Sequence, residues 1–550
     1  MTPNGSLAPL PASRLSRFNQ SMTKSLRAWH LLLLGGLGVS LATWTFAGKA
    51  PARKSSSPAG LGVPSQRLRS SREGAPADQA VARPDLIIVE APEVRVGPLS
   101  CRFPQGSRLA RLAPSDHIPQ YLTPGFFTAA DPRTSFDGTR VLFAGKQTAD
   151  SQWQIWEMSI DGSDARQVTH CAEDCLKPAY LPRGQIVYTA VPGKPCCGAF
   201  SGTVMHHTPP RANPSPQTGA TSQVWVCRVD GSDAHAITFG PGDFQAETVL
   251  KNGVILATAS SPLRPSHGLP ADRELYTLRP DGTGLATLRC DHQHPAIRSQ
   301  AQELADGTVV FVKTSLANGS VGGDLSWIRR GALHNALLTT PPILASSPQP
   351  IGADELLVAR EIPKSRPALG KLRLDSINTA SGRFSMCVYE DPKLSVVEAV
   401  PVEAHEPPRW YRSTLNPALQ RGYFICLNAY LAEGFPHGRI AAKLSRIRVL
   451  TLDAATQKET LLGDAAIEED GSFYIAVPPD KPVRFEMLDV AGRAVRSQQS
   501  WIWSRSGEER GCVGCHEDRA LVPENRWPLA LRRFDNPTVL DLPNHPTRSD

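Results

Sequence analysis

A repeated pattern in the middle of the sequence sets the strictest limit on the fold. Each copy alternates apolar and polar residues, turns at Asp-Gly and then continues for several residues. Because glycine accepts the positive backbone angle φ of a tight turn, each copy predicts one β-hairpin. The copies are QIWEMSIDGSDARQVT (154–169), QVWVCRVDGSDAHAIT (223–238) and ELYTLRPDGTGLATL (274–288).

A second strand-like segment recurs between and beyond these hairpins. One short sheet per roughly 50 residues is typical of a propeller blade, and six copies are enough to close a ring. We therefore predict a six-bladed β-propeller over residues 85–385, and a β-sandwich built from the same strands is the alternative. The segments are PDLIIVE from Pro84, GTRVLFAG from Gly138, GQIVYTA from Gly184, GVILATA from Gly253, GTVVFVK from Gly307 and DELLVAR from Asp354.

The region after the predicted propeller alternates apolar and polar residues again. Phe473 and Ile475 share one strand face, and in the next strand Arg484 points away from its apolar neighbours, so one side of this sheet faces water. We predict a small antiparallel β-sandwich over residues 386–505, followed by a cysteine-containing segment over residues 506–550. The predicted fold class is all-β.

Basic residues are concentrated at the N-terminus. Residues 1–75 contain ten Lys or Arg and one acid, so the formal net charge of +7 comes from this segment and the rest of the chain is slightly negative. The pattern gives no basic globular face, which argues against nucleic-acid binding.

An uncharged, mostly apolar run over residues 31–48 lies between Lys24 and Lys49. It predicts a signal peptide or an N-terminal membrane anchor within residues 1–48, with a buried helix as the alternative. Residues 49–84 are rich in Pro, Ser, Ala and Arg, so we expect a disordered linker. Most of the chain is then periplasmic or otherwise extracytoplasmic, and it is held at the inner membrane if the apolar run is retained.

One motif near the C-terminus suggests a cofactor. Cys512, Cys515 and His516 have the spacing C-x-x-C-H. Two thiols three positions apart can form thioethers with the vinyl groups of haem, and the adjacent imidazole can bind its iron. The motif therefore predicts covalent haem c with His516 as an axial ligand. A disulfide or half of a zinc site leaves the histidine unexplained, and a thioredoxin-like pair would need an α/β fold.

The chain has eleven cysteines, a number typical of exported proteins, in which disulfides persist. An insert near the second hairpin carries four residues that could bind zinc, although their spacing matches no standard finger, and HCAEDC (170–175) lies close by in the sequence. Disulfides, or surface residues without a ligand, are the alternative. The four candidate zinc ligands are Cys196, Cys197, His206 and His207.

Several segments together resemble the hydrazine synthase alpha subunit family, over residues 85–535. They are the hairpins ending in DGSD, GYFICLNAY, DGSFYIAVPPDKPVRFEMLD and SWIWSRSGEERGCVGCHEDR. The hairpins alone resemble TolB/PD40 propellers, which are WD40-like. The family resemblance implies a β-propeller and a β-rich middle domain with a covalently bound c-type haem, and it implies that Cys512 and Cys515 form the thioethers.

The sequence departs from this family after the motif. The synthase-type subunit continues into a further domain with a second C-x-x-C-H, and its catalytic haem is associated with a tyrosine shortly after the motif, while the motif histidine binds zinc. The residues after His516 contain neither a second motif nor a tyrosine. We therefore expect His516 to bind iron, and we do not expect hydrazine synthesis.

Three functions remain open from the sequence. The first is an exported monohaem c-type cytochrome-like protein that exchanges electrons with a redox protein partner. The second is a propeller that binds a protein or another ligand, with a structural haem or metal. The third is a haem oxidoreductase that acts on small nitrogen or oxygen species.

The surroundings of the haem stay open as well. The sixth iron position is either empty or filled by one of His405, His437, His545 and Met487. Arg510 and Arg519 could pair with the haem propionates, or remain solvated. Trp501, Trp503 and Trp527 could pack against the macrocycle, or fill the sandwich core.

Overall fold

The structure is a computed structural model. It describes residues 83–541, except 96, 98, 115–117, 193–220, 261–271, 289–295, 316–321, 330, 333–334, 340–341, 362–370, 433, 453–457 and 515–524. The described helices are the short 3-10 turns η1 (Leu99–Cys101), η2 (Pro436–Gly438) and η3 (Leu529–Leu531), and the other regular elements in this part are strands. None of these helices is long enough to cross a membrane. The all-β prediction is confirmed. The apolar run at 31–48 and almost all of the linker at 49–84 lie outside the described residues.

In the described part of the chain, strands β1 to β24 form six four-stranded antiparallel units. The innermost strands are β24 (Ser395–Pro401), β4 (Thr128–Thr134), β8 (Asp174–Leu181), β12 (Phe244–Val249), β16 (Ile297–Glu303) and β20 (Leu344–Ile351). The second strands, in the same order, are β1 (Leu86–Ala91), β5 (Arg140–Lys146), β9 (Gln185–Val191), β13 (Ile255–Ser260), β17 (Val309–Thr314) and β21 (Glu355–Glu361). The third strands are β2 (Arg108–Leu112), β6 (Gln154–Ser159), β10 (Gln223–Arg228), β14 (Arg273–Leu278), β18 (Gly323–Ile328) and β22 (Leu372–Asn378). The outermost strands are β3 (Gln120–Tyr121), β7 (Arg166–Gln167), β11 (His235–Ala236), β15 (Ala286–Thr287), β19 (Ala336–Leu337) and β23 (Arg383–Tyr389).

These units are arranged as a propeller. Each innermost strand contacts the innermost strand of the next unit, and β20 contacts β24, so the innermost strands form a closed ring. Bridges between β14 and β16 and between β18 and β20 also join the last three units into one sheet. Consecutive residues of the second strands are buried, so both faces of each strand lie inside the propeller, which explains their apolar composition.

The three Asp-Gly segments are the tight turns that the sequence predicted. They join β6 to β7, β10 to β11 and β14 to β15. Gly162 and Gly231 have φ of 89° and 85°, where a side chain would be strained. The aspartate also stabilises the turn, because Asp230 Oδ1 accepts hydrogen bonds from the backbone N of Ser232 (3.0 Å) and from its hydroxyl (2.6 Å).

The last strand of the propeller closes the ring against the first. β24 pairs antiparallel with β1, with Leu86 opposite Pro401 and Ile88 opposite Ala399. This strand lies after residue 385, which was the predicted end of the propeller. The two prolines that flank SVVEAV suggested a connection, but both faces of the segment are almost completely buried, as an innermost strand requires.

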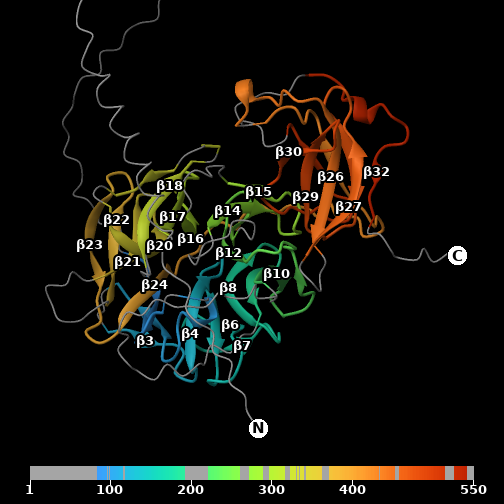
Figure 1. Ribbon diagram of the computed structural model, residues 1–550. Helices are drawn as coiled ribbons and strands as arrows, with labels where there is room; N and C mark the ends of the chain where they lie inside the picture. The colour runs from blue at the N-terminus through green and yellow to red at the C-terminus, as the bar shows by residue number, and fades with distance from the viewer. Residues whose placement is uncertain are drawn as a thin grey trace, which may run out of the picture. The chain divides into compact units, whose positions relative to one another are not determined.

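A second domain of two packed sheets follows, drawn from orange to red in Figure 1. Its core contains Phe424, Phe473, Phe485 and Met487. One sheet has the order β31 (Glu509–Cys512), β25 (Gly422–Cys426), β28 (Phe473–Val477) and β32 (Thr538–Val539). The other has the order β27 (Glu459–Ala466), β26 (Leu444–Leu452), β29 (Val483–Asp489) and β30 (Ala494–Ser497).

Residues 402–421, which we call the strap, connect β24 to β25 and are bonded to turns of the propeller. The backbone N of His405 donates to the carbonyl of Phe136 (2.8 Å), and the backbone N of Arg409 donates to the carbonyl of Lys251 (2.9 Å). The guanidinium of Arg183 lies 3.4 Å from the ring centre of Trp410. The strap is therefore held along its length although it has no regular secondary structure.

Candidate functional site

The first cysteine of the C-x-x-C-H motif is held at the end of a strand. Cys512 is the last residue of β31, which runs parallel to β25, and it lies opposite Cys426. Its carbonyl accepts a hydrogen bond from the backbone N of Leu427 (2.9 Å), and the carbonyl of Val513 accepts one from Asn428 (3.0 Å). These bonds fix the start of the motif on the sandwich. Cys515 and His516 lie outside the described residues.

Cys512 lines a pocket of about 160 Å³. The apolar part of its wall comes from the sandwich core, and the polar part comes from β30 and the residues after it. Residues of the fourth propeller unit complete the wall. The apolar residues include Phe473, Phe485, Met487 and Ile502, and the polar ones include Arg496, Gln498, Asp272 and Glu274.

The chemistry of this pocket fits a covalently attached haem. Cys512 supplies one thioether position, Phe473 and Phe485 supply aromatic surface, and the Arg496 guanidinium is suited to a propionate. Ordinary ligand pockets enclose roughly 300–1,000 Å³, so only part of a macrocycle would enter a pocket of this size.

Of the described candidates for the sixth iron ligand, Met487 lines this pocket, and His405 and His437 do not. Met487 lines it together with Cys512 and is 2% exposed. His437 is exposed in η2, and His405 lies in a different pocket, where its ring centre is 5.5 Å from that of Phe136. His545 lies outside the described residues.

Arg510 and the tryptophans have structural roles that the sequence did not settle. The Arg510 guanidinium donates to the carbonyls of Trp503 (2.5 Å) and Leu285 (2.6 Å), and burial lowers its pKa. These bonds occupy it with backbone rather than with a propionate. Trp503 is fully buried and Trp527 is 64% exposed, and neither lines the Cys512 pocket.

The predicted zinc ligands Cys196, Cys197, His206 and His207 all lie outside the described residues. In the part of the chain that is described, no group of three or more His, Cys, Asp or Glu side chains could hold a metal ion.

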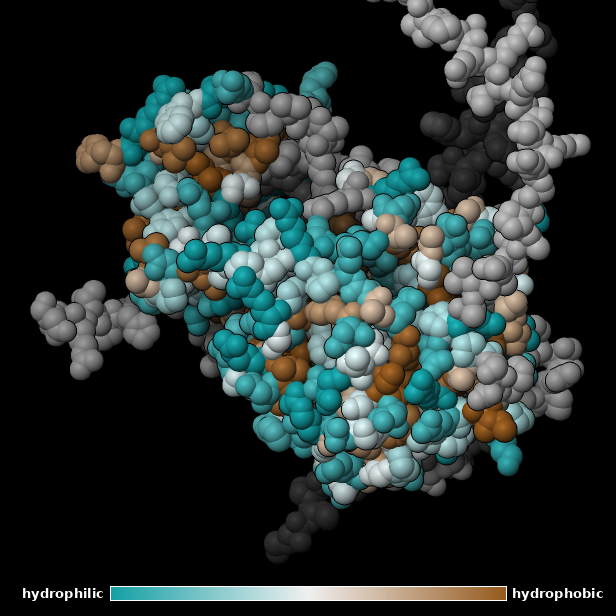
Figure 2. Space-filling view, turned by 180° about the vertical axis from the view of Figure 1, so that it is seen from behind, coloured by the Kyte–Doolittle hydropathy of each residue, from teal (hydrophilic) through white to brown (hydrophobic). Residues whose placement is uncertain are grey.

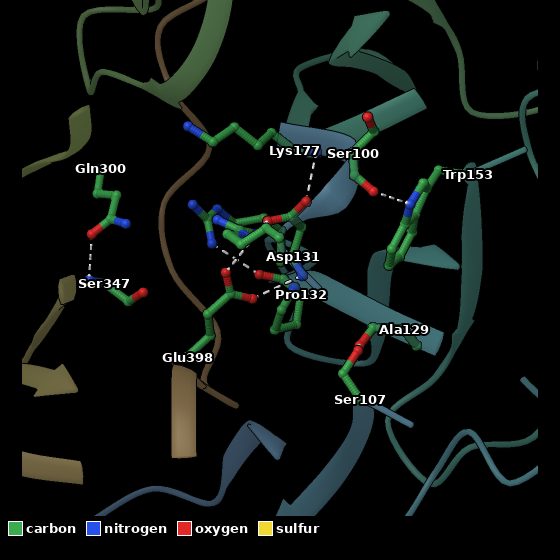
Figure 3. A network of polar contacts seen from close by, with 12 residues as sticks. Ser100, Ser107, Ala129, Asp131, Pro132, Trp153, Lys177, Gln300, Ser347 and Glu398 are labelled. Atoms are coloured by element: carbon green, nitrogen blue, oxygen red, sulfur yellow. Dashed lines mark hydrogen bonds and ion pairs between the residues drawn. The ribbon is translucent and has the colours of Figure 1, made fainter. Parts of the chain in front are cut away.

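A network at the centre of the propeller was missed from the sequence. Each innermost strand carries a β-bulge, at or next to a polar residue: Asp131, Lys177, Glu247, Gln300, Ser347 or Glu398. These side chains and their neighbours form a continuous series of polar contacts around the centre, part of which is shown in Figure 3.

The contacts in this network link one unit to the next. Glu398 accepts from the backbone N of Asp131 (2.8 Å), and Asp131 accepts from the backbone N of Lys177 (3.1 Å). The Lys177 ammonium pairs with Glu247 (2.8 Å), which accepts from the backbone N of Gln300 (2.8 Å). Gln300 in turn accepts from the backbone N of Ser347 (2.7 Å), as Figure 3 shows. The side chains of one strand thus satisfy the bulged backbone of the next.

A larger pocket lies beside this network. It has a volume of about 570 Å³, and its wall combines residues of the propeller with Glu403, His405 and Glu406 of the strap. Phe136 and Tyr180 supply its aromatic surface. The molecular face in Figure 2 is mostly hydrophilic, with hydrophobic residues in separate small patches.

Comparisons with known proteins agree with this architecture. The model of the hydrazine synthase alpha subunit middle domain matches residues 433–517, which hold most of the sandwich and the complete C-x-x-C-H motif. Hydrazine synthase subunit alpha of Kuenenia stuttgartiensis is 25% identical over 75% of this chain. The structure of Kuenenia stuttgartiensis hydrazine synthase matches with a TM-score of 0.67 at 20% identity, covering 82% of this chain and 71% of that one. The chain is thus similar to the hydrazine synthase alpha subunit in both domains.

The relationship covers both domains and leaves part of the relative unmatched. This chain spans 63% of the length of the curated alpha subunit. TolB from Acinetobacter baumannii is a further structural match, with a TM-score of 0.41 at 13% identity over 58% of this chain and 67% of that one.

Proposed function

We propose that this hydrazine synthase alpha-like chain is an exported monohaem c-type cytochrome-like protein that transfers electrons. Cys512 and Cys515 attach the haem, and His516 binds its iron. The observation that carries the proposal is the position of Cys512, at the end of a fixed strand in the wall of a pocket with a largely aromatic and aliphatic floor. The family relationship supports it, because the matched middle domain includes the whole motif.

The residues around Cys512 have distinct roles in this proposal. A bound haem supplies one-electron redox chemistry. If a haem were bound, the Met487 thioether on the pocket wall could provide a second ligand for its iron, and Phe473 and Phe485 would exclude water from the pocket. Arg496 would neutralise a propionate. A methionine ligand favours the reduced iron and would raise the reduction potential.

The remaining parts of the proposal concern location and partners. Residues 31–48 direct the chain out of the cytoplasm and anchor it if they are not removed, and covalent haem attachment of this type requires such export. The partner is a redox protein that approaches the exposed haem edge. The insert with Cys196, Cys197, His206 and His207 remains a candidate zinc site.

Expression of the full chain together with the cytochrome c maturation system tests the haem. We expect a Soret band and a haem-staining polypeptide that survives denaturation, and loss of both on changing Cys512 and Cys515 to alanine together. Cys387→Ala is the control, because this exposed cysteine lies on β23 and does not line the pocket. Covalent haem that persisted in the double variant would refute the proposal.

The role of Met487 is tested on the same haem protein. Carbon monoxide should bind the reduced Met487→Ala protein at least 10-fold more tightly than the reduced wild type, because the substitution opens the sixth position. Equal, tight binding to both would mean that the site is already open, and it would favour a haem oxidoreductase.

A binding function of the propeller is the second candidate, favoured by the pocket of about 570 Å³ beside the strap. Its volume lies within the range of roughly 300–1,000 Å³ that ligand pockets enclose. A folded chain from the maturation strain that carried no haem and an alkylatable Cys512 would favour this function.

A further inference from the structure

Two cysteines lie close together where the chain passes from β7 of one propeller unit to β8 of the next. Cys171 follows β7 and Cys175 is the second residue of β8. Their side chains interact, and the Cys175 thiol also lies 3.8 Å from the carbonyl oxygen of Glu173. The Cys171 sulfur also lies 3.8 Å from the hydroxyl of Tyr188 on β9.

The backbone holds both cysteines in these positions. The backbone N of Cys171 donates to the side-chain carbonyl of Gln154 (3.1 Å), and the Gln154 amide donates back to the carbonyl of Cys171 (2.9 Å). The backbone N of Cys175 donates to the carbonyl of Trp153 (2.7 Å). These bonds to two adjacent residues of the chain therefore hold the two cysteines close together.

The two thiols differ in accessibility and in acidity. Cys171 is half-buried, whereas Cys175 is completely buried. The hydrogen bond from Cys175 lowers the pKa of Cys171 to about 6, and the same bond, together with burial, raises the pKa of Cys175. A reactive thiolate needs both exposure and a depressed pKa, and here only Cys171 has both.

We propose that Cys171 and Cys175 are an oxidisable pair, in which Cys171 reacts with an external disulfide and Cys175 resolves the product. The Cys171 thiolate attacks one sulfur of a small or protein disulfide, whose S–S bond breaks, so that one thiolate leaves and a mixed disulfide forms. The Cys175 sulfur then attacks the Cys171 sulfur, the mixed-disulfide bond breaks, and the thiolate that leaves takes up the proton of the Cys175 thiol. Two protein thiols are oxidised to one disulfide, and the external disulfide is reduced to two thiols.

This inference is independent of the haem proposal. It concerns a propeller loop, and Cys512 belongs to the sandwich. A third cysteine, Cys227 on β10, also lies near Cys171, and burial raises its pKa to about 12, while the interaction with Cys171 and burial raise that of Cys175. Acidity therefore does not distinguish the two, and Cys175 is the resolving residue because it lies at the other end of the same short loop between β7 and β8.

Peptide mapping of the full chain tests the proposal. Trypsin gives one peptide, residues 167–183, that contains Cys171 and Cys175 and no other cysteine. Reduced folded protein is incubated with oxidised glutathione, quenched with an alkylating reagent and digested. We expect the peptide to be lighter by two hydrogens and to lack both alkyl groups.

Two variants identify the order of the steps. Cys175→Ser should leave a stable glutathione adduct on Cys171, and Cys171→Ser should leave Cys175 unmodified until denaturation. Cys387→Ser is the matched control and should not alter the product of the 167–183 peptide. Should a variant fail to fold, the wild-type map still decides. Two alkyl groups on the wild-type peptide, a lasting glutathione adduct or a crosslink to the Cys227 peptide would each overturn the proposal.

Discussion

Glu398 and Asp131 are buried neighbours in the central network, and their pKa values are shifted in opposite directions. Burial raises the pKa of Glu398 to about 6, and the ion pair with Arg102 only partly offsets this. Burial also acts on Asp131, but Arg102 and Lys177 outweigh it and lower the pKa of that carboxyl. Glu398 is therefore the group in this network that makes the stability of the protein depend on pH.

The sign of this sensitivity follows from linkage. A carboxyl whose folded pKa exceeds its unfolded value contributes stability that is present below about pH 4.5 and is lost as the pH rises through about 6. Relative to Glu398→Gln, the wild type should lose up to about 2 kcal/mol of unfolding free energy between pH 4.5 and pH 7. Urea unfolding at both pH values measures this difference.

A surface carboxyl gives the control. Glu403→Gln on the strap removes an exposed side chain and should change the unfolding free energy by less than about 0.5 kcal/mol at either pH. A wild-type curve that runs parallel to that of Glu398→Gln over this range would show that Glu398 is not the titrating group.

At the scale of the element, the Asp-Gly hairpins do more than reverse the chain. A Cβ on Gly231 would lie 2.2 Å from the carbonyl oxygen of Val168, in the preceding unit. Gly184, in the turn between β8 and β9, has φ of 68° but no atom within 4 Å of such a Cβ. A substitution at Gly184 therefore introduces backbone strain alone, whereas one at Gly231 introduces backbone strain and a close contact between units.

Alanine at each position measures these two effects. Gly184→Ala should destabilise the protein by about 1–2 kcal/mol through its left-handed backbone alone. Gly231→Ala should cost clearly more, because the neighbouring unit must also move away. Denaturant midpoints of the two variants, compared with wild type, give the difference, and equal losses would contradict the close approach between units.

The elements differed in how well the sequence predicted them. Hairpins and second strands were predictable, because their periodicity and their Asp-Gly turns lie within a few residues of each other. The bulged inner strands were not, because their polar residues look out of place until the ring brings them together. A signal was present, since Asp131, Lys177 and Ser347 each precede a proline, which cannot donate a hydrogen bond to a neighbouring strand and is found in sheets mainly at edges and bulges.

At the scale of the whole molecule, the segment before the C-x-x-C-H motif is bonded to a propeller turn. The Trp503 indole donates to the carbonyl of Gly282 (3.3 Å) and packs against Phe239 and Phe244. Glu508 accepts a hydrogen bond from the backbone N of Gly284 (2.8 Å). The sandwich therefore shares a part of its core with the propeller.

Trp503→Ala tests this connection. Removal of a fully buried tryptophan should cost about 3–5 kcal/mol and should separate thermal unfolding into two transitions, one for each domain. Trp527→Ala, at a position that is 64% exposed, should leave a single thermal unfolding transition at a temperature close to that of wild type. One transition at an unchanged temperature in both variants would refute the shared core.

The candidate site was predictable only in part for a related reason. The C-x-x-C-H spacing is local, so Cys512 could be named from the sequence alone. Met487 and Arg496 belong to other strands, and no local pattern relates them to the cysteine. Only the packing of the two sheets brings them to one pocket.

The pairing of β24 with β1 also has a consequence for how the chain is made. The two strands lie at opposite ends of the propeller sequence, so β1 has one unpaired edge until residues 395–401 have emerged from the ribosome, or from the export channel if the chain is secreted. An unpaired edge strand invites pairing with other chains, and β1 is entirely buried in the finished ring. The nascent propeller is thus exposed to misassembly for almost all of its synthesis, and the arrival of one seven-residue strand ends that interval.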